Sequence, residues 1–145
     1  MHIIGELAPE DEQELRKRAR GSDVVWADRW VDRHAMEEAI ATAGVLVFPY
    51  LPEFTRHAGA SGALAHARTF AKPLVVSDVL APELVSTAGC IEVPAGDVRA
   101  LRRVVEQALA NQLKLHDEAR SAREVVRRAH SYDDHVRALL VAASG

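Results

Sequence analysis

The loop that follows an apolar run at residues 45–48 holds residues that could bind a phosphate. Ser61 stands where a helix should begin, and Gly59 and Gly62 allow a ligand to approach the backbone closely. Free amides at the start of a helix, together with its dipole, favour a phosphate or diphosphate. Arg56 would add positive charge. In the other interpretation, Ser61 only caps the helix and the glycines only form a turn.

Two histidines near this loop raise the question of a metal site or a hydrolase. His57 and His66 have no carboxylate or cysteine at ligand spacing, so we expect no bound metal. Ser61 does not directly follow a strand, as the nucleophile of a serine hydrolase would. His66 could face a ligand or simply lie on the surface of its helix, and the sequence leaves both open.

Three further features of the sequence could serve a function or could be purely structural. Trp30 and Val31 follow the second apolar run, where they could meet a flat base. Cys90 is the only cysteine, so it cannot form an internal disulfide, and we expect a small buried residue. A basic run with acidic neighbours is expected to be a solvated helix face, comprising Arg120, Arg123, Arg127 and Arg128 with Glu118 and Glu124.

These residues must be positioned by short strands that alternate with longer helices. Alternation of this kind indicates βαβ units and a parallel sheet. The five expected strands are residues 2–4, 24–27, 45–48, 74–77 and 90–93. Ligands of such sheets bind beyond the carboxyl ends of the strands, where the strand order reverses. We therefore expect the loops after the strands to carry the site.

Capping residues mark the expected helices between these strands. Pro9 opens the first and Gly21 ends it, while Asp32 caps the second and Gly44 stops it. The remaining expected helices are residues 61–70, a short one at 82–87, and a long region opened by Gly96 and Asp97 that breaks near Asn111 and Ser131 and ends near 143.

Length and charge limit the class of protein. The chain has 145 residues, 48% of them hydrophobic, which predicts one domain over residues 1–145. Its net charge of −3 provides no basic field, so we expect no nucleic-acid partner. The longest apolar stretch, residues 44–51, is far below the roughly 20 residues of a membrane span. With no signal-peptide pattern, we expect a cytoplasmic protein without a membrane span.

Several segments follow one another in an order that resembles a known family. They are residues 2–5, 32–49, 61–67, 71–77, 82–85 and 93–97, ending in Ala100 and Leu101. The order resembles the C-terminal, donor-binding domain of the retaining nucleotide-sugar glycosyltransferases of family 4, which have the GT-B fold. The likeness covers nearly the whole chain. It implies a three-layer, Rossmann-like parallel sheet of about five strands with helices on both faces.

The resemblance also implies a ligand and residues that bind it. The family transfers a hexosyl group from a nucleotide-sugar, which is the substrate, and the resemblance implies no other cofactor. The matching loop would hold the donor diphosphate through Gly59, Ser61, Gly62 and Ala63, with Arg56 nearby. Trp30 and Val31 would meet the base. Glu83 matches an acidic position near the donor pocket, although it could equally cap its own short helix. No catalytic residue is assigned.

The chain also departs from the family pattern. The usual pair of glutamates would fall on Ala58 and His66, so His66 would have to bind the ribose hydroxyls. Ala71 replaces the usual glycine before Lys72 and Pro73. The family domain begins one strand and one helix earlier, and without that unit its order 3-2-1-4-5-6 would become 2-1-3-4-5 in this chain, as in flavodoxins.

We therefore expect a donor-binding domain that is inactive alone. Its partner would be an acceptor-binding N-terminal domain, in cis or as a separate chain, and the chain could form a homo-oligomer. Two alternatives stay open. One is a non-catalytic interaction module that keeps the fold, and the other is a flavodoxin-like binder of a phosphorylated small molecule.

Overall fold

The computed structural model describes residues 2–4, 9–21, 25–27, 31–53, 61–84 and 86–129. The chain divides into two compact units, Met1–Thr42 and Ala43–Gly145, and each is described by itself. The predicted single domain over residues 1–145 stays a prediction. Within the described ranges, no helix is both long and apolar enough to cross a membrane.

The first unit contains two strands and two helices. They are β1 (His2–Ile4), α1 (Pro9–Arg18), β2 (Val25–Ala27) and α2 (Arg33–Thr42). The strands are parallel, with Ile3 opposite Trp26. The caps predicted at Asp32 and Gly21 are confirmed, because Asp32 Oδ1 accepts the amide of Ala35 at 2.8 Å and Gly21, beyond α1, has a φ of +80°.

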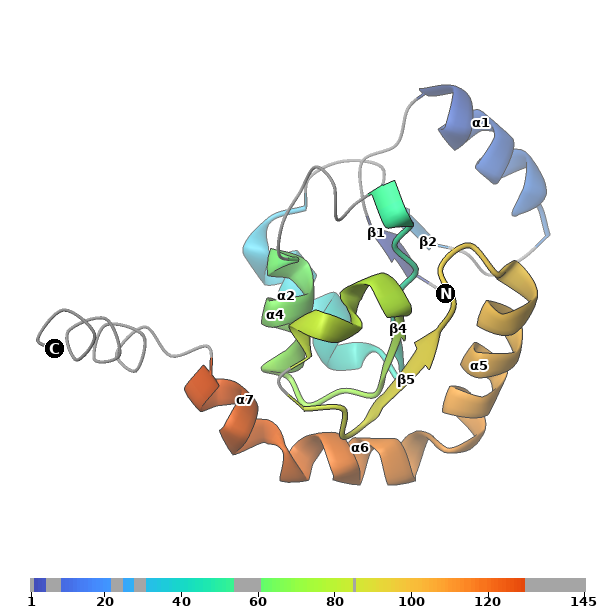
Figure 1. Cartoon of the computed structure of the whole chain (residues 1–145). Coiled ribbons are helices and arrows are strands. Elements are labelled where there is room, and N and C mark those ends of the chain that lie inside the picture. The colour runs from blue at the N-terminus through green and yellow to red at the C-terminus, as the bar shows by residue number, and fades with distance from the viewer. Residues whose placement is uncertain are drawn as a thin grey trace, which may run out of the picture. The chain divides into compact units, whose positions relative to one another are not determined.

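The second unit is a three-stranded parallel sheet with helices (Figure 1). Its elements are β3 (Leu46–Phe48), α4 (Gly62–Arg68), β4 (Leu74–Ser77), the 3₁₀ helix η1 (Asp78–Glu83), β5 (Cys90–Val93), α5 (Val98–Ala110), α6 (Gln112–Ser121) and α7 (Arg123–Ala129). The strand order is β3-β4-β5. All three strands therefore end at the same edge of the sheet.

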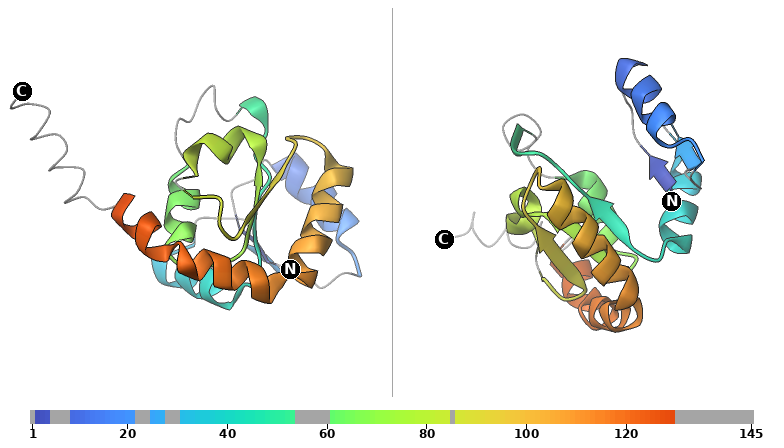
Figure 2. Two further views of the ribbon diagram at one scale, coloured as in Figure 1. Left: turned by 60° about the horizontal axis from the view of Figure 1, so that its bottom comes forward. Right: turned by 90° about the vertical axis from the view of Figure 1, so that its right-hand side faces the viewer.

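Helices cover both faces of this sheet, as Figure 2 shows for α4 and α5. Every residue of β4 is buried, and its side chains alternate between two hydrophobic clusters. One cluster joins Leu74 and Val76 to α4 and η1 through Leu64 and Leu80. The other joins Val75 to β5, α5 and α6 through Val93, Ala100, Ala108 and Leu115. This layering is compatible with a Rossmann-like class.

The predicted α/β class is thus confirmed, whereas one continuous sheet of five strands is not shown. Strands lie at the predicted places, but they pair as β1-β2 and as β3-β4-β5. These two sheets are the two parts of the predicted order 2-1-3-4-5. The link that would join them, β1 beside β3, stays a prediction because those strands belong to separate units.

The sequence misplaced one helix and missed one break. The helix predicted at residues 82–87 is wrong, because the turn after β4 is η1, which ends at Glu83. Leu80 is fully buried in the cluster with Leu64 and Val76, and this burial draws the chain into a turn directly after β4. The predicted break at Asn111 is confirmed, while the one near Ser131 lies outside the described residues.

A further break, at Ala122, separates α6 from α7 without a glycine or proline to mark it. Ala119, Ala122 and Val126 are buried on both sides of the break, which indicates that packing sets it. The solvated basic face is confirmed at Glu124, which accepts hydrogen bonds from Arg127 and Arg128. These bonds lower the pKa of the Glu124 carboxyl.

Cys90 opens β5 as predicted, but it is only half-buried and it has a polar neighbour. The buried guanidinium of Arg68 donates to the Cys90 thiol and to the carbonyl of Ser86. Burial raises the pKa of the Cys90 thiol, and the charge of Arg68 opposes that effect. The thiol therefore stays protonated near neutral pH.

Candidate functional site

The start of α4 is built by Ser61, as the sequence predicts. Ser61 has extended backbone angles, and its Oγ accepts the amide of Leu64 at 3.1 Å, which satisfies one of the free donors of the first turn. The residue is 4% exposed. Its hydroxyl therefore caps the helix, and an anion at this place would be held by backbone amides of the first turn.

The amide of Ser61 already holds an anionic oxygen from Glu83. Glu83 Oε2 accepts this N–H at 2.7 Å, although the two residues are 22 positions apart. A short bond from an amide to a carboxylate is charge-assisted, and a carboxylate is favoured at the positive end of a helix. The structure thus brings together Ser61 and Glu83, two residues predicted for the donor pocket. Glu83 ends η1 and does not cap a helix at 82–87.

Tyr50 is a third member of this cluster, and the sequence analysis did not single it out. The hydroxyl of Ser61 donates to Tyr50 Oη at 3.4 Å, and the ring of Tyr50 meets Phe48 edge-on at a centroid distance of 6.2 Å. Tyr50 follows β3 by two positions, so it lies on the α4 side of the sheet with Leu46 and Phe48. The alternation of side chains along a strand could have predicted this position, because Tyr50 is two residues beyond Phe48.

The first turn of α4 is open on its outer side. Gly62 and Ala63 are exposed, and a Cβ atom added to Gly62 would meet nothing among the described residues within 4 Å. Helix geometry also leaves the amides of these first two helical residues without partners inside the helix. A ligand oxygen could therefore reach backbone amides here, beside the carboxylate of Glu83.

His66 lies further along the same helix and packs against Phe70. The two rings meet edge-on at a centroid distance of 5.4 Å, with an interplanar angle of 76°. The ring is thus held beside the end of α4, five positions beyond Ser61. Its suggested role in binding ribose hydroxyls stays a prediction.

The other predicted ligand residues belong to the first unit or lie outside the described residues. Val31 belongs to the first unit, directly before the cap of α2, so its suggested contact with a base stays a prediction. Trp30, Arg56 and Gly59 lie outside the described residues, as does His57. Among the described residues, no three histidine, cysteine or acidic side chains lie close enough together to hold a metal ion.

Ala71 explains one departure from the family pattern. It follows α4 with a φ of +52°, in the left-handed region that favours glycine. This is the position where the resemblance implies a glycine. Ala71 therefore adopts a backbone conformation that usually selects glycine.

Comparison with known proteins does not assign the chain to a family. No protein-family model matches the chain. No curated protein matches it either. Support for a function therefore comes from the residues at the start of α4.

Proposed function

We propose that the chain is the donor-binding domain of a retaining glycosyltransferase, which binds a nucleotide-sugar through the diphosphate at the start of α4. The observation that supports this proposal is the hydrogen bond of 2.7 Å from the Ser61 amide to Glu83 Oε2. A carboxylate oxygen and a phosphate oxygen accept such a bond in the same way. Glu83 therefore occupies the place that a phosphate oxygen of the donor would take.

The charge of Glu83 has a consequence for affinity. A diphosphate that reaches the Ser61 and Gly62 amides must displace the carboxylate or lie beside it, and two negative groups at one helix start repel each other. Binding by the chain alone should consequently be weak. In the whole enzyme the amides would stabilise the leaving diphosphate as the glycosidic bond breaks. The acceptor-binding domain would come in cis or from a separate chain.

Calorimetry with the whole chain tests this proposal. UDP, GDP and ADP, each alone and as a sugar nucleotide, are titrated against the chain and against Glu83→Gln. The glutamine oxygen can still accept the Ser61 amide but carries no charge, so the variant should bind its preferred diphosphate about tenfold more tightly. Binding should be unchanged by a chelator and lost with the nucleoside that has no phosphate.

Glu92→Gln is the matched control, because Glu92 is an exposed glutamate on β5. It removes the same charge away from the start of α4, so it should leave the affinity within a factor of two. If neither the chain nor Glu83→Gln shows saturable binding of any nucleotide at millimolar concentration, the donor-binding proposal fails.

A second candidate is a non-catalytic interaction module, and the same contact favours it. An amide that is satisfied by a carboxylate of its own chain needs no ligand, and Ala58 and His66 stand where the family pattern has glutamates. This candidate predicts no nucleotide binding even by Glu83→Gln. Both candidates are compatible with the cytoplasmic location that we expect from the sequence.

A further inference from the structure

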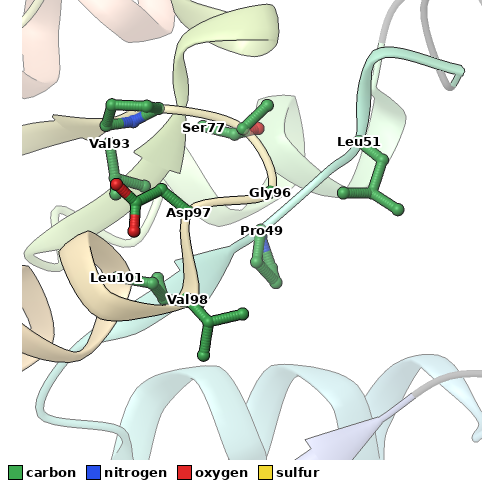
Figure 3. Close-up of a pocket in the computed structure, with 10 residues that line it drawn as sticks. Pro49, Leu51, Ser77, Val93, Gly96, Asp97, Val98 and Leu101 are labelled. Atoms are coloured by element: carbon green, nitrogen blue, oxygen red, sulfur yellow. The ribbon is translucent and has the colours of Figure 1, made fainter.

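A separate cavity lies on the other face of the sheet, where the three parallel strands end. Its volume is about 220 Å³, and its lining includes Pro49, Leu51, Ser77, Val93, Val98 and Leu101. These residues come from the segment after β3, from the last residues of β4 and β5 and from the start of α5 (Figure 3). The carboxyl edge of a parallel sheet is the usual place for a ligand.

Ser77 gives this cavity an unused polar group. The residue is 1% exposed, and its Oγ has no hydrogen-bond partner among the described residues. Side chains alternate along β4, so Ser77 shares the α5 side of the sheet with Val75, and it lines the cavity. A buried hydroxyl without a partner is uncommon and unfavourable. A ligand in the cavity would supply the missing partner when the Ser77 side chain rotates its hydroxyl toward it.

Two carboxylates, Asp97 in the lining and Asp78 beside it, already accept backbone amides. Asp97 Oδ1 accepts the amide of Ala100 at 2.8 Å and so caps α5, and Asp78 Oδ1 accepts the amide of Ala95 at 3.1 Å. The start of α5 therefore already has its anion. Two carboxylates close to the cavity disfavour a further negative charge, and the rest of the lining is mainly aliphatic. These features favour an uncharged ligand over a phosphate in this cavity.

We propose that this cavity binds a small, uncharged, mainly apolar molecule with a single ring and one hydrogen-bonding group that meets the hydroxyl of Ser77. The volume is below the roughly 300 to 1,000 Å³ typical of sites for drug-sized ligands, which limits the ligand to about one ring. This site is distinct from the start of α4. Tyr50 contacts Ser61 on one side of the chain, whereas its neighbours Pro49 and Leu51 line the cavity.

Nuclear magnetic resonance of the labelled full chain, titrated with phenol, benzene and benzoate, tests the proposal. Phenol should shift the amides of Gly96, Asp97 and Val98 saturably at millimolar concentration, and benzoate should bind more weakly than phenol. Ser77→Ala removes the hydroxyl and should weaken phenol about fivefold while it leaves benzene unchanged. Equal affinities of phenol for the chain and for Ser77→Ala would overturn the role of Ser77.

A second pair of variants tests the place of binding. Val98→Trp puts a large ring at the cavity from the first turn of α5, and Leu113→Trp puts the same ring at an exposed position in the first turn of α6. Both side chains are mostly exposed, at 76% and 84%, so both variants should fold. Val98→Trp should reduce phenol binding at least tenfold and Leu113→Trp should not. Unchanged binding by Val98→Trp, or no saturable shift in the unmodified chain, would refute the site.

Discussion

At the scale of single residues, Ser61 has two functions that involve different atoms. Its hydroxyl caps α4 through the amide of Leu64, and its own amide holds Glu83. The two interpretations left open by the sequence, a helix cap and an anion site, are therefore compatible. A variant that changes only the side chain can separate them, because the amide remains in every substitution except proline.

Ser61→Ala should destabilise the fold without abolishing ligand binding at the amide. Loss of a serine cap costs about 1 kcal/mol, measured as the free energy of unfolding in denaturant. Ser61→Thr should recover most of this loss, since threonine also caps. Ser121→Ala, at an exposed serine near the end of α6, is the control and should change stability by less than about 0.5 kcal/mol. A Ser61→Ala variant as stable as the unmodified chain would contradict the capping role.

At the scale of elements, the close contact between α6 and the β4–β5 connection depends on Gly89. Gly89 has a φ of +73°, and a Cβ atom there would lie 2.5 Å from Ala119 Cβ and 2.7 Å from the carbonyl oxygen of Leu115. The carbonyl of Gly89 also accepts the amide of Leu74 at the start of β4. Gly89 thus allows α6 to pack closely against this connection, and it also accepts the first hydrogen bond of the central strand.

Gly89→Ala should destabilise the second unit by about 3 kcal/mol, because the methyl group combines a left-handed backbone penalty with a clash against helix backbone. Gly62→Ala is the matched comparison. The added methyl group at Gly62 meets no described atom within 4 Å, so this variant should be neutral or slightly stabilising. Denaturant unfolding of both variants gives the difference. If Gly89→Ala costs no more than Gly62→Ala, then α6 does not pack as the structure has it.

At the scale of the whole molecule, the open question is whether the two sheets form one. β4 is the central strand of its sheet, with Val75 and Val76 fully buried and strands paired on both sides. Among the described residues of the first unit, β1 and β2 form one pair. A two-stranded sheet is marginally stable by itself, whereas the predicted order 2-1-3-4-5 would place β1 between β2 and β3.

Amide hydrogen exchange distinguishes these arrangements. The predicted order implies that the amides of β1, represented by Ile3, exchange nearly as slowly as those of Val75 in β4, because both strands would be interior. Exposed α6 positions such as Leu113 provide the fast reference. Exchange of Ile3 at the rate of Leu113 would contradict a continuous five-stranded sheet, while slow exchange of Val75 is expected in both cases.

Local sequence patterns predict most of the helices and strands of this protein. Strands lie where short apolar runs predicted them, and Asp32, Ser61 and Asp97 cap helices as expected, since a cap bonds only three positions along the chain. Such signals act over a few residues, so no knowledge of packing was needed. The family resemblance also implied that Ser61 and Glu83 both lie near the donor pocket, although it did not predict the hydrogen bond between them.

The composition of the two sites depends on contacts between residues that are far apart in the sequence. The bond from the Ser61 amide to Glu83 spans 22 positions, and the cavity at Ser77 joins residues at or beyond the carboxyl ends of three different strands. The same holds for η1, which begins directly after β4 because Leu80 is buried there, and for the break at Ala122. These features depend on which side chains meet when strands and helices pack, and local patterns carry no information about those distant partners.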